Sequence, residues 1–229
     1  MPVKVLAINN NGKFKDVKVL FKACRLRFND LRVPRSYKDT PDLPKNYSVV
    51  LFLTDEDLQE FDKAVEEAAK LFWGDKWQAK LRQFRKTEDH NPARKQVTDD
   101  GEVFYTVNCK ASEFIKRRNG VSEPRKLDVL KRNKQPVDWN DDSTVDENGN
   151  PAKHDIPYNG CYVNVVADLY ASDNGSTSGI YPGMTTVQFV RDGEPLGSAK
   201  TSDAQYLDDL SDDGDDGEDG KTEVDTSQF

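Results

Sequence analysis

Residues 16–28, DVKVLFKACRLRF, alternate apolar and polar side chains as a half-buried β-strand does. Apolar residues occupy odd positions as far as Phe21 and even positions from Leu26 onward. A β-bulge near Cys24-Arg25 would produce this change of phase, because one extra residue in a strand shifts the following side chains to the other face. The stretch therefore predicts a strand that carries a bulge.

The neighbouring segments predict more strands and an early helical insertion. Residues 1–13 are expected to form an extended arm that ends in a turn at Asn11-Gly12. Thr54 and Asp57 have the spacing of a capping box, which begins a helix that extends to Gly74. We predict a shorter helix over 75–86, strands over 47–53 (buried on both faces), 102–112, 161–172 and 185–191, and loops over 87–101 and 173–183.

This order of elements predicts an α+β fold that is mainly β. Five or so short strands joined by hairpin turns fit an antiparallel barrel with inserted helices, and the OB-fold is a small barrel of that kind. A β-sandwich would produce a similar pattern, so the topology stays open at this point. We expect one OB-fold-like domain over residues 1–207, followed by a tail over 208–229.

The segment 208–229 differs in composition from the rest of the chain. It contains ten carboxylates and one lysine, and its only large apolar side chains are Leu210, Val224 and Phe229. Such a segment cannot bury enough apolar surface to offset the entropy of ordering, so we expect it to be disordered. Because its last residue, Phe229, is a large aromatic, we also expect the tail to bind a partner.

Basic residues concentrate in the first 135 positions. These positions hold 29 Lys and Arg against 20 Asp and Glu, whereas 136–207 hold 3 against 11, and the most basic stretch is 114–134. A basic region is the electrostatic footprint of a phosphate-binding surface, although a solvated surface with compensated charge could have the same composition. Nucleic acid is therefore a candidate ligand.

The sequence gives little support to a membrane protein, a secreted protein, a zinc protein or an enzyme. No apolar run approaches the roughly 20 residues of a membrane span, and the N-terminus has no signal-peptide pattern, so we expect no membrane association and a cytoplasmic location. Cys24, Cys109 and Cys161 are widely separated, which indicates buried thiols in a reducing compartment. They lack the close spacing of a zinc site, and no catalytic motif is present, so we expect neither a cofactor nor an enzyme.

Three segments resemble a known family. They are YNGCYVNVVADLYA (158–171), GIYPGMTTVQFVRDGEPLG (179–197) and the strand that precedes TDED and the helix. They are similar to tailed-phage single-stranded DNA-binding proteins with OB-folds, over roughly residues 15–197. The acidic tail ending in Phe229 is independently similar to single-strand binders of phage and bacterial replication. The resemblance implies sequence-tolerant binding of single-stranded DNA, recruitment of replication proteins such as a polymerase or a helicase through the tail, and, for a phage-encoded protein, the host cytoplasm.

A groove for single strands needs cations that neutralise phosphates and aromatic rings that stack on bases. We look for it where basic and aromatic residues are interleaved; core burial is the alternative for each aromatic and is the expectation for Phe28. The candidate DNA-binding residues are Arg25, Arg27, Arg35, Tyr37, Phe104, Lys110, Phe114, Lys116, Arg117, Arg118, Arg125 and Lys126. The candidate partner-binding residues are Phe229, Asp225, Glu223, Asp219 and Glu218.

The tail has a second expected role, and other functions stay open. A flexible tether of about 22 residues spans roughly 25 Å, so its carboxylates could compete with DNA for the body's own basic groove. A scaffold protein that uses only its acidic tail, or a metal-dependent nuclease, remains an alternative. A homodimer is also compatible with the sequence.

Overall fold

A computed structural model describes residues 3–11, 14–36, 40, 43–86, 91–98, 101–116, 120–139, 155–173 and 179–196. All of them belong to one unit, Met1–Leu196. Its elements are β1 (Val3–Asn11), β2 (Phe14–Arg35), β3 (Asn46–Leu53), α1 (Asp55–Trp73), a 3₁₀ turn η2 (Gly74–Lys76), α2 (Trp77–Arg85), β4 (Ala93–Val97), β5 (Val103–Ser112), β6 (Phe114–Lys116), β7 (Ser122–Pro124), β8 (Asp128–Leu130), β9 (Tyr162–Ser172) and β10 (Gly179–Arg191). Within this described part, no helix is long and apolar enough to cross a membrane. The predicted tail, 208–229, lies outside the described residues.

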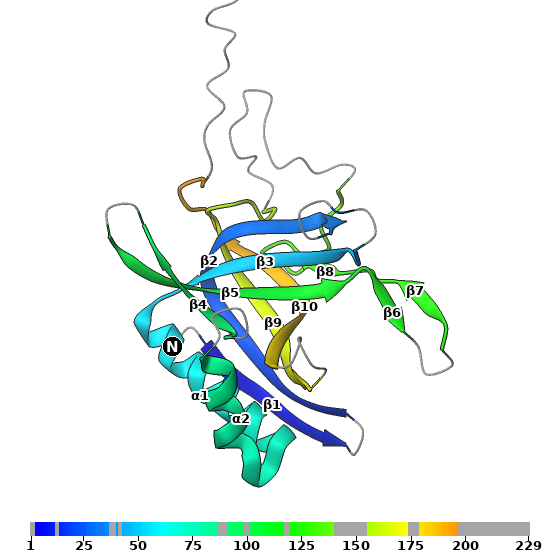
Figure 1. Ribbon diagram of the computed structural model, residues 1–229. Coiled ribbons are helices and arrows are strands. Elements are labelled where there is room, and N and C mark those ends of the chain that lie inside the picture. Colours follow the sequence, from blue (N-terminus) through cyan, green and yellow to red (C-terminus); the bar gives the residue numbers. More distant parts are fainter. Residues whose placement is uncertain are drawn as a thin grey trace, which may run out of the picture. The chain divides into compact units, whose positions relative to one another are not determined.

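Five of the strands close into a barrel (Figure 1). Strand β3 pairs with β2 and β5, β2 pairs with β9, and β9 pairs with β10, all in antiparallel fashion. A parallel bridge between Gly183 of β10 and Lys110 of β5 closes the ring. A five-stranded barrel of this kind is the OB-fold. The predicted α+β, OB-fold-like architecture is therefore confirmed.

The strand predicted from DVKVLFKACRLRF is β2, which contributes to two parts of the sheet. Its first half pairs with β1 and β9, and its second half pairs with β3. The register against β9 shifts between Phe21 and Cys24, and Ala23 adopts a positive φ of 51° there. The backbone N–H of Ala23 donates to Oδ1 of Asn164 at 2.9 Å, which stabilises the bulge. The predicted bulge is present, slightly before its expected position at Cys24-Arg25.

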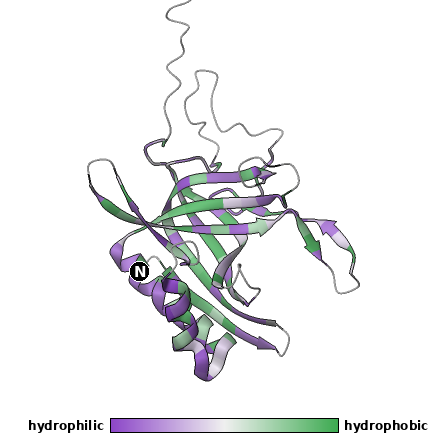
Figure 2. Cartoon of the chain, viewed as in Figure 1, coloured by the Kyte–Doolittle hydropathy of each residue, from purple (hydrophilic) through white to green (hydrophobic). Residues whose placement is uncertain are grey.

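Apolar side chains on the inner faces of the strands form the core, and helix α1 packs against it. Val17, Val19 and Phe21 of β2 are fully buried, as their alternation predicts. Phe61 of α1 packs on Phe21, with 5.4 Å between the ring centroids. Burying a side chain of this size stabilises a fold by about 1.5–3 kcal/mol. Figure 2 shows the resulting alternation of hydrophobic and hydrophilic segments along the strands.

Helix α1 begins and ends where the sequence predicts. The backbone N–H of Asp57 donates to Oγ1 of Thr54, and the Asp57 carboxylate accepts the Thr54 N–H at 3.1 Å, so both halves of the capping box are present. The helix ends at Trp73, and Gly74 follows with a φ of 50°, a conformation that glycine adopts without a Cβ clash.

The three cysteines are free and buried, as expected of structural thiols. Burial raises the pKa of Cys24 and of Cys161 to about 12, and it raises the pKa of Cys109 further. These side chains therefore remain neutral thiols at physiological pH. Among the described residues, no group of three or more His, Cys, Asp or Glu side chains could hold a metal ion.

Three expectations about the strands are wrong, and each has a physical reason. The loop expected over 87–101 contains β4, an edge strand. Most of its side chains are exposed, so its polar ARKQV sequence lacks the apolar pattern that predicts a strand. Strand β10 begins at Gly179, so Tyr181 and Pro182 lie in a strand where glycine and proline had indicated a loop. Strand β3 is not buried on both faces, because Val50 and Phe52 are only half-buried on its outer side.

Candidate nucleic-acid interface

The outer faces of β3 and β5 carry polar and aromatic side chains. Along β5, Val107 and Cys109 are buried in the core, which turns Asn108 and Lys110 outward. Strand β3 alternates in the same way, and its Val50 lies directly opposite Asn108. In chain order, β3 and β5 are the second and third strands of the barrel. That face of an OB-fold is the one on which oligonucleotides commonly bind.

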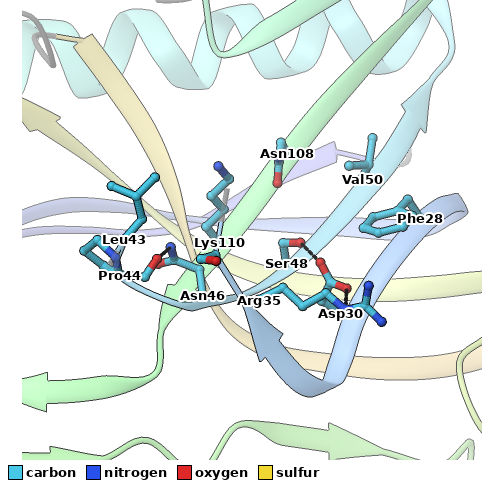
Figure 3. Close-up of a pocket in the computed structure, with 11 residues that line it drawn as sticks. Phe28, Asp30, Arg35, Leu43, Pro44, Asn46, Ser48, Val50, Asn108 and Lys110 are labelled. Carbon is cyan, nitrogen blue, oxygen red and sulfur yellow. Dashed lines mark hydrogen bonds and ion pairs between the residues drawn. The ribbon is translucent and has the colours of Figure 1, made fainter. Parts of the chain in front are cut away.

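A groove of about 460 Å³ crosses this face, and we call it the β3–β5 groove. Figure 3 shows Leu43 and Pro44, from the connection between β2 and β3, at one end and Phe28 at the other. Asn108 and Lys110 lie between these ends. The residues that line the groove are Phe28, Asp30, Arg35, Ser36, Leu43, Pro44, Asn46, Ser48, Val50, Asn108 and Lys110.

The single carboxylate in this lining is compensated by its neighbours. Asp30 accepts a hydrogen bond from the Ser48 hydroxyl at 3.1 Å and pairs with Nε of Arg35 at 3.3 Å (Figure 3). The Asp30 side chain is 12% exposed and that of Arg35 is 62% exposed, so the cation rather than the anion faces solvent. With Lys110 added, the groove presents a positive surface, which suits a phosphate chain.

Lys110 lines the groove in an environment that disfavours its charged ammonium form. Although the residue is exposed by area, partial desolvation in the groove lowers the pKa of Lys110, and the nearby positive charge of Arg94 lowers it further. A phosphate beside Lys110 would favour the charged ammonium and offset both effects.

A cluster of aromatic rings and one arginine continues the same face beyond Val50. The register of β2 against β3 shifts between Leu26 and Phe28, and this second bulge leaves both Arg27 and Phe28 exposed. The guanidinium carbon of Arg27 lies 5.9 Å from the ring centroid of Phe52 and 5.3 Å from that of Phe104. Such a cluster offers flat surfaces on which bases can stack.

A smaller hollow of about 120 Å³ adjoins the groove, and we call it the tyrosine hollow. Tyr170 and Tyr181 pack with 6.0 Å between their ring centroids. A Cβ on Gly183 would lie 3.2 Å from Cε1 of Tyr170, so the ring lies close over the backbone of the residue that pairs with Lys110. The hollow is lined by Asn91, Pro92, Arg94, Asn108, Lys110, Tyr170, Ile180, Tyr181 and Pro182, and it therefore shares Asn108 and Lys110 with the groove.

The structure brings only some of the predicted DNA-binding residues together. Arg35 and Lys110 line the groove, and Arg27 and Phe104 belong to the neighbouring cluster. Arg25 does not join them, because it pairs in register with Tyr162 of β9 and donates from Nη2 to the carbonyl of Glu194 at 3.1 Å.

The predicted residues of the basic stretch 114–134 lie elsewhere. Phe114 and Lys116 are exposed on the β6–β7 hairpin, which projects from the barrel in Figure 1. Arg125 and Lys126 line a separate hollow of about 430 Å³ beside β8, together with Trp139. The remaining predicted residues, Tyr37, Arg117, Arg118, Phe229, Asp225, Glu223, Asp219 and Glu218, lie outside the described residues.

Sequence reasoning missed several residues of the groove and the hollow. Phe28 was expected to be buried, but it is 45% exposed because the second bulge turns it outward. Tyr170 and Tyr181 come from adjacent strands, and the segment of Tyr181 resembled a loop. Arg94 and Asn108 carry no motif of their own. For β5, however, the alternation already placed Asn108 on the face of Lys110.

Comparison with known proteins identifies the family and supports the fold. Residues 17–218 match the family described as "Enterobacter phage Enc34, ssDNA-binding protein". The single-stranded DNA-binding protein of bacteriophage Enc34 has a similar fold: its TM-score is 0.51 at 15% identity, with 90% of this chain and 99% of that chain covered. Its complex with ssDNA also has a TM-score of 0.51, at 16% identity over 84% of this chain and 98% of that one.

One relative matches part of this chain at higher sequence identity. "Putative protein p50" of Acyrthosiphon pisum secondary endosymbiont phage 1 is 36% identical over 69 residues, which are 29% of this chain and 37% of that protein. The prediction that the chain is not an enzyme agrees with the matched family, which is named for ssDNA binding. Because the family match extends over most of the sequence, the chain belongs to the Enterobacter phage Enc34 ssDNA-binding protein family.

Proposed function

We propose that this protein binds single-stranded DNA, with little sequence preference, across the outer face of β3 and β5. The observation that carries the proposal is the convergence of Arg35, Lys110 and the exposed ring of Phe28 in one groove of about 460 Å³. Membership of a family named for ssDNA binding supports the same conclusion.

The physical properties of the groove favour a single strand over a duplex. Exposed rings at Phe28 and Tyr170 offer stacking surfaces, and stacking needs bases that are not already covered by their neighbours. Because every base has a flat face, a surface of this kind is tolerant of sequence. The cations meet the phosphates and release counterions, so affinity should fall steeply as salt rises.

Fluorescence polarisation with a labelled oligo(dT) tests this proposal, at two salt concentrations and with unlabelled duplex as competitor. We expect tight binding at low salt, a steep loss at high salt and poor competition by duplex. Duplex that competes as well as oligo(dT) at equal nucleotide concentration would contradict the preference for single strands. Cleavage of the oligonucleotide on addition of magnesium would indicate a nuclease instead.

We further propose that residues 1–207 form the DNA-binding domain and that 208–229 form an acidic tail with two roles. Its ten carboxylates compete with DNA for the cations of the body, and its Phe229 inserts into an apolar pocket of a replication protein. The composition supports this, because a segment with a net charge of −9 is attracted to a basic groove and is least screened at low salt.

Truncation after Leu207 tests the competition. We expect tighter binding of oligo(dT) by the truncated protein, with the largest difference at low salt. Removal of Phe229 alone should leave DNA affinity nearly unchanged while weakening association with the replication partner. Equal DNA affinity of full-length and truncated protein across a salt series would show that the tail does not compete.

A further inference from the structure

Asn108 lies where the β3–β5 groove and the tyrosine hollow meet, and it lines both. Its Oδ1 atom is buried, and no donor among the described residues bonds to it. In Figure 3 the side chain points into the groove beside Lys110. A buried carbonyl without a partner is costly, so this atom can accept a hydrogen bond from a donor that the described residues do not supply.

Several polar groups near Asn108 are donors or are already paired. Lys110 and Arg94 can only donate hydrogen bonds. The amide nitrogen of Asn46 donates to the carbonyl of Pro44 at 3.2 Å, and Asp30 is held by its two neighbours. Among the described residues, the junction therefore presents cationic donors and a buried neutral acceptor without a partner, Oδ1 of Asn108.

DNA can satisfy that acceptor in only one way. The phosphates and deoxyribose rings within a DNA strand carry acceptors but no hydrogen-bond donors, whereas the bases carry N–H groups on their edges. The cations can pair with phosphates, whereas the Asn108 carbonyl can accept a hydrogen bond from the edge of a base. Every base has at least one N–H group, so a single acceptor can be satisfied without selecting one sequence.

We infer that Oδ1 of Asn108 accepts a hydrogen bond from the N–H edge of one nucleobase, which is held at the junction of the groove and the tyrosine hollow. Tyr170, exposed and packed near Tyr181, provides a flat wall for that base, and Lys110 provides the cation for its phosphate. This inference rests on the proposed function, since it names the part of the DNA that this site contacts.

Thymine tests the inference sharply because its edge carries a single N–H, at N3. Affinities are measured for oligo(dT) and for the same oligomer with N3-methylthymine, using wild-type protein and N108L. Leucine has a similar size and removes the amide without breaking any bond that the structure describes. For wild type we expect the N3-methyl oligomer to bind about two- to tenfold more weakly, the effect of one lost hydrogen bond. For N108L we expect both oligomers to bind equally, at the weaker level.

N46A is the matched control, because Asn46 lines the groove but its amide nitrogen is bonded within the protein. This variant should retain the N3-methyl penalty of wild type. A penalty that persists unchanged in N108L would overturn the inference, because the methyl group would then act elsewhere. A selective loss of oligo(rU) relative to oligo(dU) in N108L would also overturn it, because the donor would be a 2′-hydroxyl. If wild type bound neither oligomer, the proposed function itself would have failed, which is a distinct outcome.

Discussion

The β3–β5 groove and the basic stretch 114–134 both hold cations and aromatic rings, but they use them differently. In the basic stretch, Nε of Arg125 donates to the carbonyl of Ser112 at 2.8 Å, which ties the chain after the β6–β7 hairpin to β5. Arg132 pairs with Asp155 at 3.4 Å and lies 5.5 Å from the ring centroid of Phe189. These two arginines stabilise local structure.

In the groove and the adjoining tyrosine hollow, by contrast, cations from distant parts of the sequence converge around Lys110, which lines both. Arg35 comes from β2, Lys110 from β5 and Arg94 from β4, and a phosphate chain crossing the strands would meet all three. Under the proposed function, the density of charge along the sequence is therefore a poor guide to the interface. What matters is which charges a sheet brings to one concave face and leaves exposed there.

The largest expected difference in DNA affinity is between variants of two phenylalanines of similar exposure. Phe28 is 45% exposed in the groove, and Phe114 is 47% exposed on the β6–β7 hairpin. Because base stacking contributes about 1–3 kcal/mol per base, F28A should weaken binding of oligo(dT) by roughly 5- to 150-fold. F114A should change the affinity much less. Fluorescence titration of both variants measures the difference, and a larger loss for F114A would move the interface to the hairpin.

Two exposed lysines provide the next comparison. Lys110 lies at the centre of the groove, and Lys126 lines the hollow beside β8. On single strands, each phosphate contact adds about 0.7 to the slope of log affinity against log salt. K110A should therefore flatten that slope by about this amount, whereas K126A should leave it unchanged. The opposite result would assign the phosphate contacts to the basic stretch.

The two regions should also respond differently to loss of a structural arginine. R132A removes a partly exposed ion pair with Asp155 and a cation–π contact with the ring of Phe189. It should therefore lower the free energy of unfolding by about 1 kcal/mol. Its affinity for oligo(dT) should remain that of wild type. Urea denaturation and a DNA titration on the same preparation measure both quantities. Normal stability with weakened DNA binding would show that Arg132 faces the ligand.

The smallest expected effect is a dependence of affinity on alkaline pH. The pKa of Lys110 is lowered, mainly by desolvation, so its charge is lost at a lower pH than that of an ordinary lysine. Phosphate binds the charged ammonium of Lys110, so the affinity for DNA is highest below this pKa and declines as the pH rises through it. K110R should bind with a flatter pH profile, because arginine remains charged throughout. Identical profiles for wild type and K110R would mean that Lys110 does not meet a phosphate.

The sequence predicted the barrel better than it predicted the groove. Alternation along DVKVLFKACRLRF and the capping box at Thr54 are local signals, so β2 and α1 could be placed directly. The groove depends on strand register, which brings Phe28 opposite Val50 and Val50 opposite Asn108. That juxtaposition depends on a bulge and on pairings between distant segments, and no local pattern encodes it. Lys110 and Arg35 were predicted because they are cations interleaved with aromatic residues, and Asn108 could not be chosen on that ground.

We propose that single-stranded DNA lies across the outer face of β3 and β5. Ultraviolet cross-linking of the full chain to oligo(dT), followed by mass spectrometry of the linked peptides, tests it most directly. We expect the linked side chains to include Phe28 of β2 and Tyr170 or Tyr181 of the tyrosine hollow. Cross-links confined to residues 114–134, with none on β2, β5, β9 or β10, would contradict it.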